Sequence, residues 1–271
     1  MTATDLVPPA AAAPSGPILD LSPAPGAAPS GGMLVAQARQ ELRGLLRNGE
    51  QLLLALVVPV VLLVAGARAD VVKLAAGTRR IDALTPGVIA LAALSISFTG
   101  QAIATGFERR YGVLKRLGAT PLPRWGLLGG KVLAVLAVEV VQVVVLGLLA
   151  LALGWRPHGD PVSVLVLLGA GTAAFTALGL LLAGTLRAEA TLALANLVWL
   201  LLLLTGGVVV PLSEYPAAAA HVAELLPLGA LAEGLRAVLE RGATLPVGDL
   251  LVLLAWALGA GALASRFFRW E

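Results

Sequence analysis

Six long apolar segments dominate this chain of 271 residues and leave it few ways to fold. They lie near residues 51–67, 86–105, 128–153, 162–185, 190–210 and 247–264. A helix needs roughly 20 apolar residues to cross a hydrocarbon core of about 30 Å, and it satisfies its own backbone hydrogen bonds there. The first segment is short and contains Pro59, but Gln51 and Arg68 flank it and can sit at the two membrane interfaces. The pattern therefore predicts an all-α integral membrane protein with six transmembrane helices.

The composition agrees with a membrane protein and excludes several kinds of site. Hydrophobic residues make up 58% of the chain and charged residues only 13%, against about 25% charge in an ordinary soluble domain. Cysteine is absent, so the chain contains no disulfide, thiol nucleophile or thiolate metal ligand. The two histidines, His158 and His221, are too isolated to form a metal centre. We therefore expect no metal site, no catalytic residues and no nucleic-acid partner.

The residues before the first apolar segment divide into two parts. Residues 1–32 consist mainly of Ala, Pro, Ser and Gly, a composition that predicts a disordered tail. Residues 33–48 place Val35, Ala38, Leu42, Leu45 and Leu46 on one helical face and Gln40, Arg43 and Arg47 on the other. This pattern predicts an amphipathic helix that lies on the membrane surface. We expect the membrane domain to extend over residues 33–271.

The Lys and Arg residues between the apolar segments predict the orientation in the membrane. If the amino terminus lies inside, twelve of the 19 basic residues are on the inner side and seven are on the outer side. Because cytoplasmic loops carry the excess of basic residues, we expect a multi-pass protein of the cell membrane with both termini in the cytoplasm. The charged stretch FERRYGVLKRLGATPLPRW, residues 107–125, is then cytoplasmic.

The charged stretch has the pattern of one short amphipathic helix. Helical spacing places Phe107, Tyr111, Leu114 and Leu117 on one side and Glu108, Gly112, Lys115 and Arg116 on the other. Glu108 lies in the first turn and Lys115 in the last, as the helix dipole favours. Gly118 and Pro121 then predict the end of the helix. From its charge alone, such a loop can bind either anionic lipid headgroups or a protein partner.

Two sequence motifs resemble the permease subunits of ABC-2 type transporters. Glu108, Gly112, Leu114, Leu117 and Pro121 form the spacing E-x3-G-x-L-x2-L-x3-P and lead into Gly130 and Lys131. Further along, GGVVVPLSEYP at residues 206–216 and LPLGALAEGLRAVL at residues 226–239 resemble the external segment that precedes the last span in that family. The likeness covers residues 33–265 and includes all six apolar segments.

The resemblance implies a function and a set of partners. In this family the loop between the second and third spans is similar to a coupling helix that docks on a cytoplasmic ATPase subunit. The matching positions here are Glu108, Arg109, Gly112, Leu114, Lys115, Arg116, Leu117 and Pro121. The resemblance also implies that two permease chains, identical or paralogous, pair with two ATPase subunits that use ATP and Mg²⁺. Similar proteins export drugs, antibiotics, lipids or polysaccharides, and we expect a hydrophobic drug or antibiotic, or a lipid.

The chain itself lacks a recognisable nucleotide-binding motif, and we expect it to bind no cofactor. The nearest sequence, WGLLGGKV at residues 125–132, has Trp125 where the first Gly of a phosphate-binding loop belongs and Val132 after the Lys. We expect Lys131 to extend towards the inner membrane interface instead. ATP hydrolysis is therefore expected on a separate subunit.

The external segment has the pattern of a re-entrant helical hairpin. Residues 216–226 and 228–240 are each about half as long as a membrane span, and Pro211, Pro216 and Pro227 interrupt them. The hairpin carries the polar residues Glu224, Glu233 and Arg236. Glu233 and Arg236 lie one helical turn apart, which favours an ion pair between them over a role in substrate binding.

Polar residues inside the apolar segments are candidates for a substrate pathway. Glu139 and Gln142 lie about one turn apart in the third segment. Glu139 is about 12 Å beyond Lys131 along the helix, which places it near the middle of the membrane. Asn196, in the fifth segment, either lines the same interior or ties helices together.

Two alternatives to an ATP-driven permease follow from the same polar residues. A buried carboxyl group leaves open a proton-coupled secondary transporter that uses Glu139. An intramembrane enzyme would need Ser95 or Ser97 beside a histidine. We rank the enzyme last, because both histidines fall in outer loops.

Overall fold

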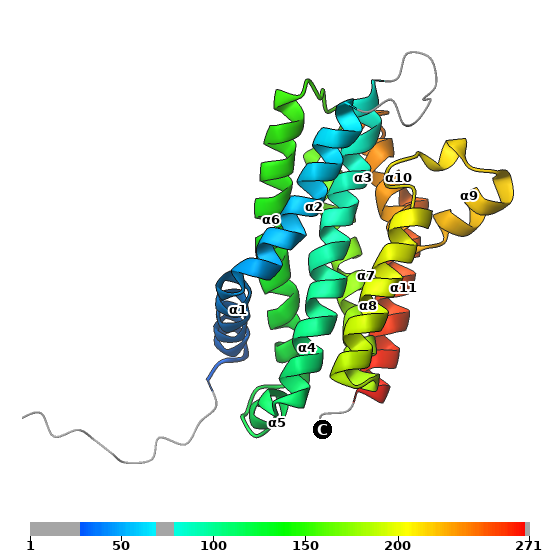
Figure 1. Cartoon of the computed structure of the whole chain (residues 1–271). Helices are drawn as coiled ribbons and strands as arrows, with labels where there is room; N and C mark the ends of the chain where they lie inside the picture. The colour runs from blue at the N-terminus through cyan, green and yellow to red at the C-terminus, as the bar shows by residue number, and fades with distance from the viewer. Residues whose placement is uncertain (1–27, 69–78, 269–271) are drawn as a thin grey trace, which may run out of the picture.

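The computed structural model describes residues 28–68 and 79–268, and helices joined by short connections make up this part of the chain (Figure 1). The predicted tail, residues 1–32, therefore falls largely outside the described residues. The helices are α1 (Ser30–Arg47), α2 (Gly49–Arg68), α3 (Arg80–Leu94), the π-helical segment η1 (Ser95–Gly100), α4 (Gln101–Arg110), α5 (Val113–Gly118), α6 (Arg124–Ala152), α7 (Pro161–Thr185), α8 (Ala188–Thr205), the 3-10 turn η2 (Leu212–Glu214), α9 (Ala217–Glu224), α10 (Pro227–Leu239) and α11 (Val247–Phe267).

In the described part of the chain, five helices are long and apolar enough to cross a membrane, and together they confirm the predicted all-α membrane fold. They cover Arg80–Arg110, Trp125–Ala152, Pro161–Thr185, Ala188–Thr205 and Val247–Phe267. The first of the six predicted spans lies in α2, a helix of 20 residues that contains Pro59 and includes the apolar stretch Ala55–Arg68.

Two span boundaries differ from the predicted ones. The second predicted span is part of one helical stretch from Arg80 to Arg110, in which α3, η1 and α4 follow one another without a break. The fifth predicted span was expected to reach residue 210, but α8 ends at Thr205. The next residues turn sharply, since Gly207 has a φ of 66° that side chains disfavour.

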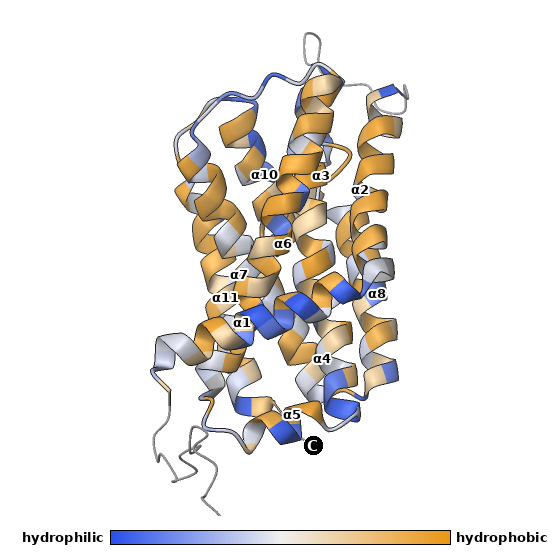
Figure 2. Cartoon of the chain, turned by 90° about the vertical axis from the view of Figure 1, so that its left-hand side faces the viewer, coloured by the Kyte–Doolittle hydropathy of each residue, from blue (hydrophilic) through white to orange (hydrophobic). Residues whose placement is uncertain are grey.

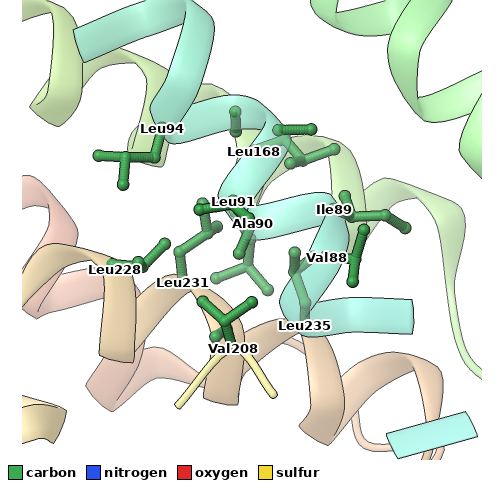
Figure 3. Packing of buried hydrophobic residues seen from close by; sticks show 14 of the residues in the cluster. Val88, Ile89, Ala90, Leu91, Leu94, Leu168, Val208, Leu228, Leu231 and Leu235 are labelled. Carbon is green, nitrogen blue, oxygen red and sulfur yellow. The ribbon is translucent and has the colours of Figure 1, made fainter. Parts of the chain in front are cut away.

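The core lies around α3, which packs against α2, α10, α6 and α7. Leu91 and Leu94 of α3 are fully buried, and Leu91 lies beside Leu231 of α10 (Figure 3). In a bilayer, such packing stabilises through van der Waals contact, because lipid chains are as apolar as Leu. The membrane domain is therefore organised around the second span.

Helix α1 lies across the outside of the bundle and packs mainly on α6 (Figure 2). Of the predicted apolar face, Leu45 is buried and Ala38 and Leu42 are half-buried, whereas Val35 and Leu46 are exposed. The prediction missed that Gln37 is buried too, with Glu41 half-buried beside it. The polar side chains of this face turn inward because α6 presents a buried cation to them, as described below.

The bundle has two different ends. Helix α5 lies at one end, which we call the α5 end, and α9 and α10 lie towards the other, which we call the α10 end (Figure 1). The helices α9 and α10 confirm the two short helices predicted for the external hairpin. Every residue of α10 is buried except Glu233, which is half-buried, whereas most of α9 is exposed.

Candidate coupling site

The charged stretch at the α5 end forms two helices, so the prediction of one helix over residues 107–117 is wrong. Helix α4 continues the second span to Arg110, and α5 begins only at Val113. Between them, Gly112 has a φ of 68°, a left-handed conformation that residues with a side chain rarely adopt. The break at Gly112 turns the chain, so Glu108 and Lys115 do not share one helical face.

Helix α5 has one buried side and one exposed side. Leu114 is fully buried, and Leu117 is half-buried. Lys115 and Arg116 are exposed, and Pro121 is exposed just beyond the helix. The helix therefore presents two basic side chains outward, while Leu114 holds it against the membrane helices.

Glu108 faces the protein and binds Lys131. The Lys131 ammonium lies 2.7 Å and 3.0 Å from the two carboxylate oxygens of Glu108 on α4. It also donates a 3.1 Å hydrogen bond to Glu41 on α1, whose other oxygen accepts a 2.7 Å bond from Gln37. The predicted extension of Lys131 to the membrane interface is therefore wrong, because Lys131 is only 1% exposed and two carboxylates compensate its charge.

This ion cluster, Glu41–Lys131–Glu108, connects three helices. Lys131 contributes α6, Glu41 contributes α1 and Glu108 contributes α4. Gly130 allows the contact, since a methyl group there would lie 2.6 Å from Cγ of Gln37. With one cation and two carboxylates, the cluster carries a formal charge of −1.

Arg109 and Arg110 join the end of α4 to the connection between α7 and α8. Arg109 donates hydrogen bonds to the carbonyl oxygens of Gly184, at 2.8 Å, and Leu186. Cations are favoured at a helix carboxyl terminus, where carbonyl groups lack partners. Arg110 forms an ion pair with Glu189 in the first turn of α8. The end of the second span is thus tied to α6, α7 and α8 by charged side chains.

The candidate pathway residues point in three directions and do not line one interior. Glu139 is buried on α6 and accepts a hydrogen bond from Thr172 of α7. Gln142 is also buried, but it donates a 3.1 Å bond to the carbonyl oxygen of Ala55 in α2. Asn196 is exposed on α8 and donates to Leu192 of its own helix.

The serines considered for an enzyme bind their own helix. Ser95 donates to the Leu91 carbonyl oxygen at 2.8 Å and accepts a 2.9 Å bond from the indole of Trp199. Ser97 donates to the Ala93 carbonyl oxygen. Among the interactions of the described residues, neither serine bonds to a histidine, so this geometry offers the hydroxyl groups no general base.

The α10 end contains a buried Arg that binds backbone groups. Arg236 is 2% exposed and donates hydrogen bonds to the carbonyl oxygens of Ala83, at 3.0 Å, Gly207 and Val208, at 3.1 Å. The predicted pair with Glu233 is confirmed, with 3.6 Å between their charged atoms. Burial lowers the pKa of the Arg236 guanidinium, and the Glu233 carboxylate raises it again.

Glu233 also binds a second Arg, whereas Glu224 stands apart from this cluster. Glu233 forms a 2.8 Å ion pair with Arg241, whose side chain is 56% exposed. Burial raises the pKa of the nearby Glu240 carboxyl group, and Arg236 acts in the opposite direction. Glu224 is exposed at the end of α9.

Sequence reasoning missed Glu41 as a partner of Lys131 and Thr172 as a partner of Glu139. Glu41 and Gln37 are four residues apart, a spacing that predicts one helical face, but the apolar residues beside them suggested a different face. Thr172 lies in an apolar segment and gives no local signal. Contacts between distant segments decide both positions.

The sequence profile of the ABC-2 type transporter family matches residues 33–239. This range runs from α1 through α10 and includes the ion cluster, α5 and Arg236. The chain belongs to the ABC-2 type transporter family. None of the curated proteins compared with the chain matches it.

Family membership defines the role of the chain in coarse terms. An ABC-2 membrane protein is the permease subunit of an ABC transporter, and this permease is a multi-pass membrane protein. Its membrane domain is a transport permease. This assignment leaves the intramembrane enzyme without support.

Proposed function

We propose that this permease exports a hydrophobic or amphipathic substrate, a drug, an antibiotic or a lipid, with energy from ATP. A separate cytoplasmic ATPase subunit binds ATP and Mg²⁺ and docks on α5. A second permease chain, identical or paralogous, completes the membrane part of the complex. Both termini and the α5 end face the cytoplasm.

The single observation that carries this proposal is the construction of α5. Helix α5 presents Lys115 and Arg116 outward. The turn at Gly112 connects it directly to the 31-residue helical stretch Arg80–Arg110. A force applied to α5 therefore acts directly on the helix around which the core is packed. Exposed charges give a docking surface orientation and register.

Reversing the charge of α5 tests the docking. In the variant Lys115→Glu/Arg116→Glu, we expect the ATPase subunit to co-purify at a tenth of the wild-type level or less, because two attractive contacts become repulsive. The matched control is Arg43→Glu/Arg47→Glu, which reverses two exposed charges on α1. Equal loss in both variants, or loss in neither, would contradict docking on α5.

Cysteine labelling tests the orientation. The chain lacks Cys, so single cysteines at Thr120, near the α5 end, and Ser213, in η2, report each side separately. A membrane-impermeant thiol reagent applied to intact cells is expected to label position 213 and not position 120. The reverse pattern would overturn the orientation.

One observation favours a second function, a proton-coupled transporter that uses Glu139. Its carboxyl group is buried, and Oε1 has no hydrogen-bond partner among the described residues. In an export assay at matched protein levels, this alternative predicts that Glu139→Gln abolishes proton-driven transport. The ATP-driven proposal predicts that Glu139→Gln transports normally and that dissipating the proton gradient leaves export unchanged.

A further inference from the structure

A cleft lies between α1 and the second span at the α5 end. It has a volume of about 380 Å³. One wall is a stripe of α1 that contains Gln37, Gln40 and Glu41, and the other is a stripe of α4 that contains Gln101 and Glu108. Gln37 lies three and four positions before Gln40 and Glu41, and Gln101 lies seven positions before Glu108, so each group lies on one side of its helix. The cleft has the size of a binding site for a small molecule.

The cleft contains two carboxylates and one buried amide oxygen that has no donor among the described residues. Gln101 is 1% exposed, and its side-chain oxygen has no hydrogen-bond partner in the described part of the chain. A buried acceptor left without a partner costs roughly 1–3 kcal/mol. Glu41 and Glu108 line the same cleft, and the ion cluster to which they belong carries a formal charge of −1. The missing partner is therefore a donor, preferably one that carries positive charge.

An aromatic pair supplies the apolar side of the cleft. Phe107 and Tyr111 both line it, and their rings stack with centroids 6.1 Å apart. Tyr111 is 66% exposed although it is large and aromatic. The faces of aromatic rings attract cations within about 6 Å of the centroid and also accept apolar groups.

We propose that this cleft binds a cationic amphiphile, a molecule with a protonated amine or other charged N–H donor on an apolar aromatic body. The donor bonds to Gln101 and faces the carboxylates of Glu41 and Glu108, and the body stacks on Phe107 and Tyr111. The inference rests on the proposed function, since it names the substrate class of the same permease. It places the substrate directly beside α5.

Direct binding to the full-length permease tests the inference without any ATPase. The protein is reconstituted in nanodiscs of phosphatidylcholine, whose headgroup offers no N–H donor. Fluorescence anisotropy then measures binding of rhodamine 123, a cation with amino groups, and of fluorescein, an anion with a similar ring system. We expect rhodamine 123 to bind saturably and at least tenfold more tightly than fluorescein. Competition by added phosphatidylethanolamine would support the same chemistry, with a lipid ammonium as its source.

Substitutions of Gln40, at the exposed edge of the cleft, are expected to change the affinity for rhodamine 123 in opposite directions without disturbing buried residues. Gln40 is an exposed residue that lines the cleft. We expect Gln40→Glu to tighten rhodamine 123 binding about threefold and Gln40→Lys to weaken it about threefold, with both effects reduced by salt. Equal affinities in the two variants would contradict a cation site here.

Substitutions of the buried Gln101 and of the aromatic Tyr111 test the two contacts proposed for the ligand. Gln101→Leu and Tyr111→Leu are each expected to weaken rhodamine 123 binding about tenfold. The matched controls are Thr105→Val, on the same helix, and Tyr215→Leu, at the α10 end, and both are expected to bind as the wild type does. Unchanged affinity in both Gln101→Leu and Tyr111→Leu, or tight binding of fluorescein, would overturn the proposal.

The outcome is separable from that of the proposed function. If rhodamine 123 does not bind while the ATPase subunit still co-purifies through α5, the cleft proposal fails and the exporter proposal stands. If the dye binds as expected while charge reversal of α5 leaves the ATPase attached, the docking proposal fails and the cleft remains.

Discussion

Each end of the membrane domain contains a deeply buried cation, and the two cations bind mainly different kinds of partner. At the α5 end, Lys131 binds the side chains of Glu41 and Glu108, which belong to two other helices. At the α10 end, Arg236 binds the backbone carbonyl oxygens of Ala83, Gly207 and Val208. Side-chain carboxylates can exchange partners when helices shift, whereas carbonyl oxygens stay where the chain path places them. The first arrangement allows movement, and we call the ion cluster Glu41–Lys131–Glu108 the joint. The second arrangement is rigid, and we call Arg236 with its carbonyl partners the anchor.

The surroundings of the two charges agree with this distinction. Gly112 breaks the helix at the α5 end, and a cleft opens beside Glu108. At the α10 end, α10 is buried along almost its whole length, and Gly87 is in such close contact with Val208 that a methyl group would not fit. Motion imposed on α5 is therefore expected to change the α5 end more than the α10 end.

Removing the Arg236 guanidinium is expected to lower the stability of the protein more than any other change considered. Arg236→Leu leaves three carbonyl oxygens without their donor and Glu233 without its buried partner, at a cost of roughly 3–5 kcal/mol. Thermal unfolding in detergent, followed by Trp fluorescence, measures the fall in Tm. The control Arg241→Leu removes the exposed partner of Glu233 and should cost no more than about 1 kcal/mol. Similar Tm values for the two variants would contradict the anchor.

Removing the cation of the joint is expected to have a smaller effect on stability. Lys131→Met leaves Glu41 and Glu108 facing each other, at a cost of roughly 2–4 kcal/mol. The cost is lower than for Arg236 because these carboxylates are 12% and 25% exposed and can bind water. The same unfolding assay measures it.

A compensated variant separates charge from packing at the joint. Lys131→Met/Glu41→Gln/Glu108→Gln removes the cation and both negative charges together, so we expect it to regain at least half of the lost stability. Failure to regain any would mean that the fit of the Lys131 side chain, and not its charge, holds α1, α4 and α6 together. The exporter proposal further predicts that this variant loses substrate-stimulated ATP hydrolysis although it remains folded.

Features that depend on local pattern were predictable from the sequence. Apolar length located the third, fourth and sixth segments to within a few residues, because a span must cover the hydrocarbon core. The short helices of the hairpin followed from Pro216 and Pro227, and the Glu233–Arg236 pair followed from helical spacing.

Features that depend on contacts between distant segments were not predictable. Periodicity gave α1 an apolar face, but it could not show that Lys131, some 90 positions away, turns the Gln37–Glu41 face inward. Gly112 was interpreted as one position on a helix, although a left-handed residue there ends α4. The partner of Glu139, Thr172, lies in a segment with no polar pattern. In each case an element far along the chain decides the outcome.

Adding a methyl group at Gly130, where α6 contacts α1, is expected to lower the stability by a smaller amount. A Cβ on Gly130 would lie 2.6 Å from Cγ of Gln37 and 3.2 Å from the backbone nitrogen of Ala38. Gly130→Ala therefore pushes α1 away from α6, at a cost of about 1–2 kcal/mol in the unfolding assay. The control Gly147→Ala lies on the same helix with open space around it and should be neutral or stabilising. Equal destabilisation would indicate a helix effect and not a contact with α1.

The smallest expected effect concerns the amino termini of the helices at the two ends. At the α10 end, Asp160 caps the start of α7, and its carboxylate accepts hydrogen bonds of 3.1 Å and 3.0 Å from the backbone N–H groups of Val162 and Ser163. Helices α6 and α8 begin at the α5 end without a side-chain cap. Such a cap satisfies N–H groups that have no partner within the helix.

The capping bonds give the effect a defined dependence on pH. The backbone N–H groups of Val162 and Ser163 favour the ionised carboxylate and hold the pKa of Asp160 below its ordinary value of 3.8. The stability that the charged cap contributes is therefore fully present above pH 3.8 and is lost as the pH falls through the lowered pKa. We expect Asp160→Ala to lower the Tm slightly near neutral pH, and this difference from the wild type to shrink on acidification. Asp160→Asn keeps an acceptor that does not titrate, so its Tm relative to Asp160→Ala should not change with pH. A constant gap between the wild type and Asp160→Ala down to about pH 3 would mean that the charge of the cap contributes nothing.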